Sequence, residues 1–288
     1  MKFNKTLIKS KLKASAVHLG ISLIIFFILA YQIYYVWYPQ PYFSVDGGWQ
    51  GIRIIAAVDL VLGPLITFLI FDWSKSRRAI TFDLVTIAVI QISALVYGVA
   101  TTYNQRPVAI ILADEYFIPA IESDYGSQLE SMSELSQYSA ESPPIIWSEI
   151  AIDRAVLDEV MRIKFDKKIV EYAQIQLYQP AEKLMFGLQK RQVNTMTILD
   201  LSGAQQRYGQ WLEKNQKSPD EVLLGLFNGR YGRIWLVFDS TAKYIDYFKW
   251  LVWIAGFKNK VNSAIGCKSR ETSIESRAFY FCIPHPHH

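Results

Sequence analysis

Three apolar stretches decide the fold: AVHLGISLIIFFILAYQIYYVW at 16–37, IIAAVDLVLGPLITFLIF at 54–71 and LVTIAVIQISALVYGVAT at 84–101. A helix needs about 20 mainly apolar residues to cross a hydrocarbon layer roughly 30 Å thick. The first stretch contains no Asp, Glu, Lys or Arg, and the other two lack the polar stripe of a soluble helix. We therefore predict three membrane-spanning helices over about residues 16–103. Two helices buried in a soluble core are the alternative for the second and third stretches.

The positions of the basic residues predict which ends face the cytoplasm. Residues 1–15 carry five lysines, and the loop between the second and third stretches carries Lys75, Arg77 and Arg78. The first loop, 38–53, has a single basic residue, Arg53. Because Lys and Arg stay on the cytoplasmic side, the N-terminus and second loop face in, and residues 104–250 face the periplasm. The long first stretch, with no A-x-A site after it, favours an uncleaved anchor over a signal peptide.

Aromatic residues mark the ends of these stretches. Such residues gather where a membrane meets water. We expect an outer group to anchor the bundle at that boundary, and it comprises Trp37, Tyr38, Tyr42, Phe43 and Trp49.

The charge balance gives no support for nucleic-acid binding. The whole chain of 288 residues has a formal net charge of +4. Residues 1–103 hold 9 Lys and Arg against 4 Asp and Glu, whereas residues 104–250 hold 16 against 20. The basic excess therefore lies beside the apolar stretches, where a membrane explains it.

Residues 104–250 predict a small α+β domain. VAIILA at 108–113 indicates a buried strand, and RIWLVFD at 233–239 followed by 243–250 indicates a hairpin that this strand can join. Residues 123–148 are typical of a loop with one weak helix. We expect helices at 153–165 with Asp153 as N-cap, at 181–189, at 202–215 with Ser202 as a cap, and at 220–226.

Residues 251–288 have no clear pattern, and we expect them to be poorly ordered. Cys267 and Cys282 are the two cysteines of the chain, and the residues leave open whether they pair. The chain ends in PHPHH at 284–288, which is either incidental or a weak transition-metal tract.

The sequence offers little for catalysis. Outside the tail the one histidine is His18, and no P-loop, dinucleotide fingerprint or metal-ligand spacing occurs. A nucleophile needs a positioned base. We therefore predict no catalytic residue, no metal, no cofactor and no enzyme activity.

Asp59 is the most informative residue, because a carboxylate inside an apolar helix is costly and tends to face protein or water. It lies about 8 Å into the second stretch, and Gln91 lies about 15 Å into the third. Asp59 either snorkels to the outer headgroups or meets a polar group on a partner helix, and a bond to Gln91 is a further option. Gly63-Pro64 interrupts the helix one turn on and creates either a packing kink or a docking notch. Small residues such as Gly98 allow close helix contact.

A family resemblance joins these features. The runs DLVLGPLITFLIFD at 59–72 and FDLVTIAVIQISALVYGVATTYNQRPV at 82–108, with WLVFDSTAKYIDYFKW at 235–250, resemble the TfpX/TfpZ-type accessory proteins of type IV pilins. The resemblance implies a bacterial inner-membrane factor that helps a cognate pilin reach the surface as fibre. Its partners would be a type IV pilin, the assembly machinery and membrane lipid, with no nucleic acid. The partner-binding candidates are Asp59, Gly63, Pro64, Gln91, Gly98 and Arg106.

Two other functions fit the residues less well. A periplasmic ligand-sensing or regulatory module would need a signalling domain in the cytoplasm, where the second loop has about a dozen residues. A transporter or membrane-embedded enzyme subunit would need more than three spans and one carboxylate.

Overall fold

The computed structural model describes residues 5–151 and 153–249. The chain divides into two compact units, Met1–Arg106 and Pro107–His288. The predictions for the tail (disorder, a metal tract and a cysteine pair) lie outside the described residues.

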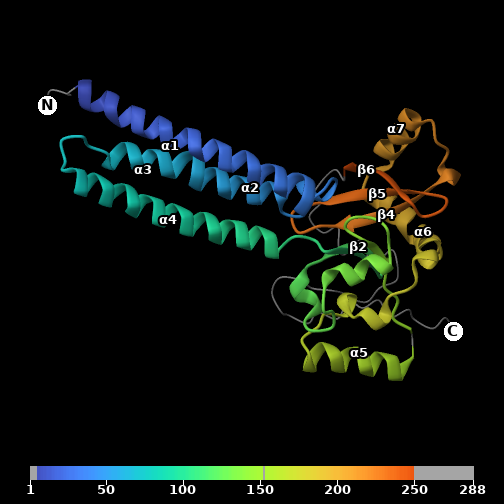
Figure 1. Cartoon of the computed structure of the whole chain (residues 1–288). Coiled ribbons are helices and arrows are strands. Elements are labelled where there is room, and N and C mark those ends of the chain that lie inside the picture. Colours follow the sequence, from blue (N-terminus) through green and yellow to red (C-terminus); the bar gives the residue numbers. More distant parts are fainter. Residues whose placement is uncertain (1–4, 152, 250–288) are drawn as a thin grey trace. The chain divides into compact units, whose positions relative to one another are not determined.

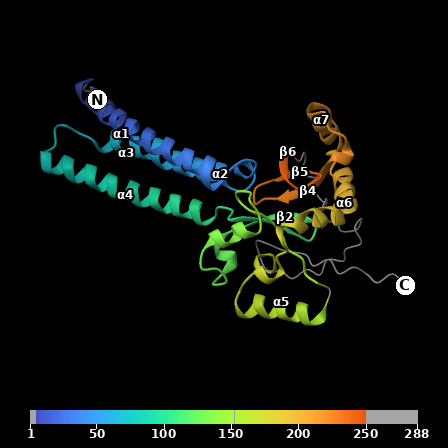
Figure 2. The same cartoon turned by 45° about the vertical axis from the view of Figure 1, so that its right-hand side comes forward.

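The first unit is built from three long helices that run side by side (Figures 1 and 2). The first consists of α1, Lys5–Tyr31, and a π-helical end, η1, Gln32–Trp37. The second joins α2, Gly48–Ala56, through a π-helical segment, η3, Ala57–Leu62, to α3, Gly63–Ile70. The third is α4, Arg77–Asn104. All three are long and apolar enough to cross a membrane, and each extends beyond the apolar stretch that predicts it.

The π-helical segment η3 accommodates Pro64. Proline has no N–H, so the usual hydrogen bond to the carbonyl of Leu60 is absent. The N–H of Gly63 donates to the carbonyl of Val58, five residues back, and the backbone dihedral angles of Gly63 stay helical. A single wide turn of this kind is a common feature of functional sites in helices.

The aromatic residues of the 38–49 loop differ in exposure. Tyr38, Tyr42 and Phe43 are buried, whereas Trp49 is exposed. Their place at a membrane boundary stays a prediction. The Tyr38 hydroxyl donates to the carbonyl of Thr102 at 3.0 Å, and a 3-10 turn, η2, Tyr42–Ser44, folds the loop inward. Loop and helix ends therefore share one apolar cluster built around Ile33, Tyr38, Phe43 and Ile55.

The second unit contains a six-stranded mixed sheet in the order β3-β1-β2-β4-β5-β6. The strands are β1, Ala109–Ala113; β2, Tyr116–Ala120; β3, Ile145–Trp147; β4, Val222–Asn228; β5, Arg233–Asp239; and β6, Tyr244–Lys249. Pairs β1–β2, β4–β5 and β5–β6 are antiparallel, whereas β1–β3 and β2–β4 are parallel. The helices are α5, Arg154–Asp166; α6, Leu184–Leu201; and α7, Gln205–Asn215, and six short 3-10 turns, η4 to η9, lie between these elements.

The structure confirms part of the predicted domain. The strand at 108–113 and the hairpin at 233–249 are present and share one sheet. Asp153 caps α5, because its Oδ1 accepts hydrogen bonds from the N–H groups of Ala155 at 2.9 Å and Val156 at 3.3 Å. The mixed sheet with helices agrees with an α+β unit.

Three predictions for this domain are wrong, and one predicted helix is longer than expected. Residues 222–228 form strand β4 instead of a helix, because their buried side chains pack between strands. The helix at 181–189 begins as a 3-10 turn and continues to Leu201. Ser202 ends α6, and its hydroxyl donates to Leu199 instead of capping α7. The loop at 123–148 ends in a strand, β3, whose three residues are all buried.

The sheet has a narrow seam between β2 and β4, which pair at Tyr116–Leu226 and Phe117–Phe227 alone. The Val108 N–H donates to the carbonyl of Ala120, so Ala120 faces β1, and the strand alternation turns Pro119 toward β4. Proline has no N–H to donate to β4, so the hydrogen-bond ladder between β2 and β4 ends before Pro119. At the other end of this ladder, next to the β1–β2 turn, the Gln192 amide of α6 takes the place of a strand. It donates to Leu224 O at 2.8 Å and accepts from Leu224 N at 3.3 Å.

Each half of this sheet has its own apolar cluster. One cluster joins β1, β2 and β3 to α5 and the turns around Tyr125 and Tyr172. The other joins β4, β5 and β6 to α6 and α7, with Trp235 and Trp211 among its members. Tyr116, at the seam, packs against both clusters.

Candidate functional site

A polar network lies inside the three-helix bundle and contains Asp59. The Asp59 side chain is 1% exposed. Gln91 of α4 donates from Nε2 to Asp59 Oδ1 at 2.7 Å and to Ser22 Oγ of α1 at 3.4 Å. The bond between Asp59 and Gln91 that the sequence left open is therefore formed. Asp59 points inward and does not snorkel outward.

Gly63 makes room for this contact. A Cβ atom added at Gly63 would lie 2.4 Å from Gln91 Oε1 and 2.6 Å from Gln91 Nε2. Any larger residue at position 63 would displace the amide from Asp59. The Gly63-Pro64 interruption is thus a notch, and this chain's own Gln91 occupies it.

A second part of the network joins α1 to α3. Ser15 donates to the Pro64 carbonyl at 2.8 Å, and His18 Nδ1 lies 2.6 Å from Thr67 Oγ1. Thr67 in turn donates to the Gly63 carbonyl at 3.0 Å, so both carbonyls of the Gly63-Pro64 step have a donor. Lys11 donates to Leu69 O at 2.8 Å, at the end of α3.

Sequence reasoning missed this side of the network, although a signal exists. Lys11, Ser15, His18 and Ser22 recur at intervals of four, three and four residues, so they share one face of α1. Polar residues on one face of an otherwise apolar span indicate contact with a neighbouring helix.

Two of the six candidates lie apart from the network. Gly98 packs near Ile54, whose Cγ2 lies 3.6 Å from where a Cβ would stand, and its carbonyl accepts from Thr102 at 2.8 Å. Arg106 follows the end of α4, donates to Tyr103 O at 3.0 Å and stacks 3.6 Å from the Tyr103 ring centre. The structure therefore brings Asp59, Gly63, Pro64 and Gln91 together, and places Gly98 and Arg106 elsewhere in the bundle.

The network is suited to holding helices together. In hydrocarbon an unpaired polar group costs several kcal/mol, so each bond penalises separation of the helices. Asp59 Oδ2 and Gln91 Oε1 remain buried without a partner among the described residues. Over the same residues no group of three or more His, Cys, Asp or Glu could hold a metal.

A separate charged cluster lies in the soluble unit, at the β1–β2 turn. Arg191 of α6 donates to the carbonyl of Asp114 and, at 2.9 Å, to that of Gly187. Asn194 donates to Glu115 at 3.0 Å. Desolvation by the surrounding chain raises the pKa of Asp114 to about 6, although the residue stays solvent-accessible, and the Arg191 charge opposes this rise. Desolvation also lowers the pKa of the Arg191 guanidinium. Asp114 therefore takes up a proton in mild acid.

Three helices long and apolar enough to cross a membrane share an internal polar network, and one mixed-sheet unit follows them. The comparisons with known proteins agree on one family. The family model described as fimbrial assembly protein FimB matches residues 6–47, which form most of the first helix and its loop.

Curated relatives come from Dichelobacter nodosus. The fimbrial assembly protein of serogroups C1 and C2 is 36% identical over 99 residues, which cover 34% of this chain and 76% of the relative. Those of serogroup E1, 35% identical, and serogroup I, 36% identical, match over 99 residues that cover 38% of each relative. The chain belongs to the fimbrial assembly protein family. No solved structure matches it significantly.

Proposed function

We propose that this chain is an inner-membrane accessory factor for type IV pilus biogenesis, which promotes assembly or surface display of a cognate pilin. The observation that carries the proposal is the match to fimbrial assembly proteins of D. nodosus. Three helices able to cross a membrane agree with a membrane anchor. The family points to an accessory role without catalysis, and the finer resemblance to TfpX/TfpZ-type factors belongs to the same proposal.

In this proposal the membrane contact is made by the outward faces of the bundle. Asp59, Gly63, Pro64 and Gln91 are engaged with one another and with α1, so they act on a partner by fixing the positions of α3 and α4. Gly98 does the same further along α4, and Arg106 holds the end of that helix. A direct bond from Asp59 to a pilin would require the bundle to open.

The outward face of α4 is suited to a second helix. It carries a row of small, hydroxylated or aromatic residues, all exposed and spaced by helical turns: Thr86, Ser93, Ala94, Tyr97 and Thr101. Small and hydroxylated side chains let helices approach closely in a membrane. The apolar helix of an unassembled pilin would meet this row, while the mixed-sheet unit, on the periplasmic side, would recognise the pilin head.

Crosslinking in intact membranes tests the membrane contact. A photo-reactive residue replaces Ala94 on the proposed face, or Ile24, an equally outward residue on α1, as the matched control. We expect capture of pilin from position 94 and not from position 24. Equal capture from both, or none from position 94 in cells that make pili, would contradict the proposed face.

A further inference from the structure

We propose that one end of the helical bundle is a binding site for an anionic phospholipid. Five cations would attract its headgroup: Lys5, Lys9, Lys13, Arg77 and Arg78. Its acyl chains would lie along the exposed apolar surface of the same helices. The site depends on the bundle lying in a bilayer, and it is independent of any role with a pilin.

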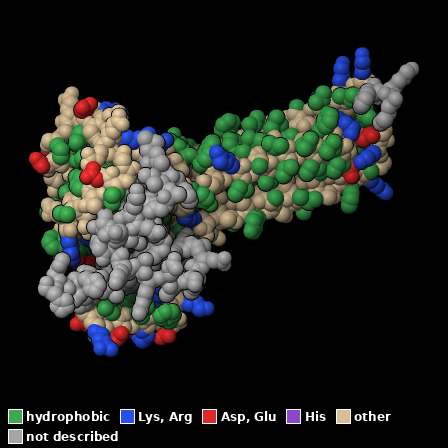
Figure 3. Space-filling model, turned by 180° about the vertical axis from the view of Figure 1, so that it is seen from behind, with side chains coloured by type: hydrophobic (Ala, Val, Ile, Leu, Met, Phe, Trp, Pro, Cys, Tyr) green, Lys and Arg blue, Asp and Glu red, His purple; other side chains and the backbone are tan. Residues whose placement is uncertain are grey.

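The five cations, called the basic end below, are exposed at the starts of α1 and α4. Lys5, Lys9 and Lys13 are four residues apart and share one face of α1. Among the described residues none of the five has a carboxylate within ion-pair distance. Figure 3 shows blue side chains gathered at this end of the bundle, beyond a broad green surface.

The other two cations at this end are already engaged. Lys11 donates to the Leu69 carbonyl, and Lys75 pairs with Asp83 at 2.6 Å. Asp83 is thereby neutralised, and Asp72 accepts both the N–H and the hydroxyl of Ser74 at 2.8 Å. The unpaired charge at this end is therefore strongly positive, and the anion it requires comes from outside the described residues.

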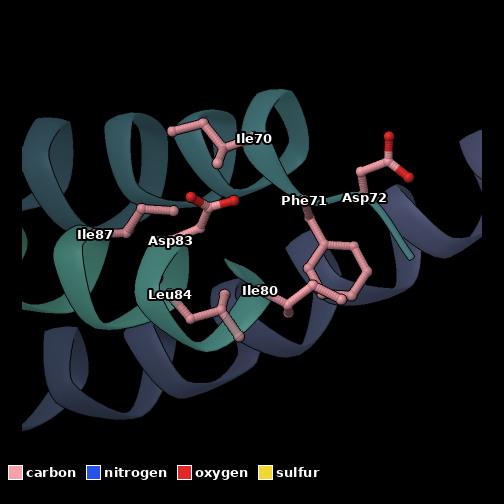
Figure 4. Close-up of a pocket in the computed structure, with 7 residues that line it drawn as sticks. All are labelled: Ile70, Phe71, Asp72, Ile80, Asp83, Leu84 and Ile87. Carbon is pink, nitrogen blue, oxygen red and sulfur yellow. The ribbon is translucent and has the colours of Figure 1, made fainter. Parts of the chain in front are cut away.

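A shallow hollow between α3 and α4 adjoins the basic end, and it is too narrow to hold a water molecule. It is lined by Ile70, Phe71, Asp72, Ile80, Asp83, Leu84 and Ile87. Figure 4 shows apolar side chains of both helices and two carboxylates around it. Ile80, Leu84 and Ile87 continue down α4 from Arg77 and Arg78, so these apolar residues lie within about three helical turns of the charge.

A phospholipid fits this combination better than an acidic protein segment. Exposed apolar residues continue directly from the cations along the helices: Leu12, Val17, Phe82 and Val85. A lipid matches both features at once, with phosphate at the cations and acyl chain on the apolar surface. Basic clusters at the ends of membrane helices attract anionic headgroups in this way. An acidic peptide would satisfy the charge and leave the apolar surface uncovered.

The test uses the full chain, reconstituted in phosphatidylcholine with a minor share of phosphatidylglycerol and then extracted mildly. Native mass spectrometry counts the two lipids that stay bound. We expect phosphatidylglycerol to exceed its bulk share by about fivefold for each cation that engages phosphate. The variant K5Q/K9Q/K13Q/R77Q/R78Q should return to the bulk ratio, and replacing the three lysines by arginine should preserve the enrichment.

The matched control removes five exposed cations from the soluble unit, R154Q/K167Q/K183Q/K214Q/K243Q, and should keep the enrichment. Bulk lipid ratios in the wild type would overturn the site, as would undiminished enrichment in a folded five-glutamine variant. Binding of a soluble poly-glutamate probe without phosphatidylglycerol enrichment would assign the basic end to an acidic protein instead.

Discussion

Gly63→Ala is the sharpest test of the network inside the bundle. The added methyl would stand 2.4 Å from Gln91 Oε1 and 2.7 Å from Gln91 Cδ, far inside van der Waals contact. Gln91 is a flexible side chain, so it can swing away. Doing so breaks its 2.7 Å bond to Asp59 and leaves that buried side chain without its donor.

The size of the effect follows from this lost bond. A hydrogen bond to a charged group contributes about 1.5–3 kcal/mol in water-soluble proteins. Bonds between membrane helices average about 0.6 kcal/mol and reach about 1.7 kcal/mol. Alanine itself favours a helix over glycine by about 1 kcal/mol, which partly offsets the loss. We expect Gly63→Ala to lower the free energy of unfolding by about 1 kcal/mol.

A double-mutant cycle isolates the cause. In a Gln91→Ala background the new methyl meets no amide, so Gly63→Ala should become neutral or stabilising, with a coupling energy of about 1 kcal/mol or more. The assay is denaturation of the purified chain in mixed micelles with increasing dodecyl sulfate, followed by circular dichroism. The reasoning would be refuted if the losses in free energy of unfolding of the two single variants sum, within about 0.5 kcal/mol, to the loss in the double variant.

Three further predictions address the network and the soluble unit. Asp59→Asn keeps an oxygen that can accept from Gln91, so cells with this variant should retain surface pili, whereas Asp59→Leu should reduce their number. Loss of pili in an Asp59→Asn variant whose bundle stays folded would show that the negative charge itself acts. Folding raises the pKa of Asp114 from 3.8 to about 6, so its contribution to stability is present below pH 4 and is lost as the pH rises through about 6. With solvent screening at this exposed turn we expect a loss of about 1 kcal/mol, absent in Asp114→Asn and measured by melting the soluble unit in the full chain. Gln192→Leu leaves the N–H and carbonyl of Leu224 unpaired and should cost about 2 kcal/mol in chemical denaturation, against little for Gln189→Leu on the exposed side of the same helix.

The helices of the bundle were predictable because hydropathy is a local property. Each apolar stretch coincides with a helix of the structure except at Phe71, and the helices begin before the stretches because their polar starts are helical as well. The strands of the soluble unit were harder. Strand β2 contains Pro119, which argues against a central strand, and its ladder to β4 joins two residue pairs. The distant residue Gln192 satisfies β4 at the other end of that ladder, which no local pattern predicts. The sequence pattern at residues 222–228 does not favour a strand over a helix.

The candidate site was predictable in its members and not in its geometry. Asp59 and Gln91 stand out because polar residues in apolar helices are costly. Their contact depends on the rotation of two helices, which hydropathy does not determine. Ser15, His18 and Ser22 were missed because each alone is unremarkable in a span, and their common face matters only once a neighbouring helix is known.

The two-residue seam between β2 and β4 has a mechanical consequence for the soluble unit. Each half of the sheet retains its own apolar cluster, so the halves can open separately. Amide exchange should sort β1–β3 and β4–β6 into two groups with different opening free energies. A pull on one half would reach the other through Tyr116, Phe117 and the bonds from α6 to the β1–β2 turn, and the unit would then yield in stages under load.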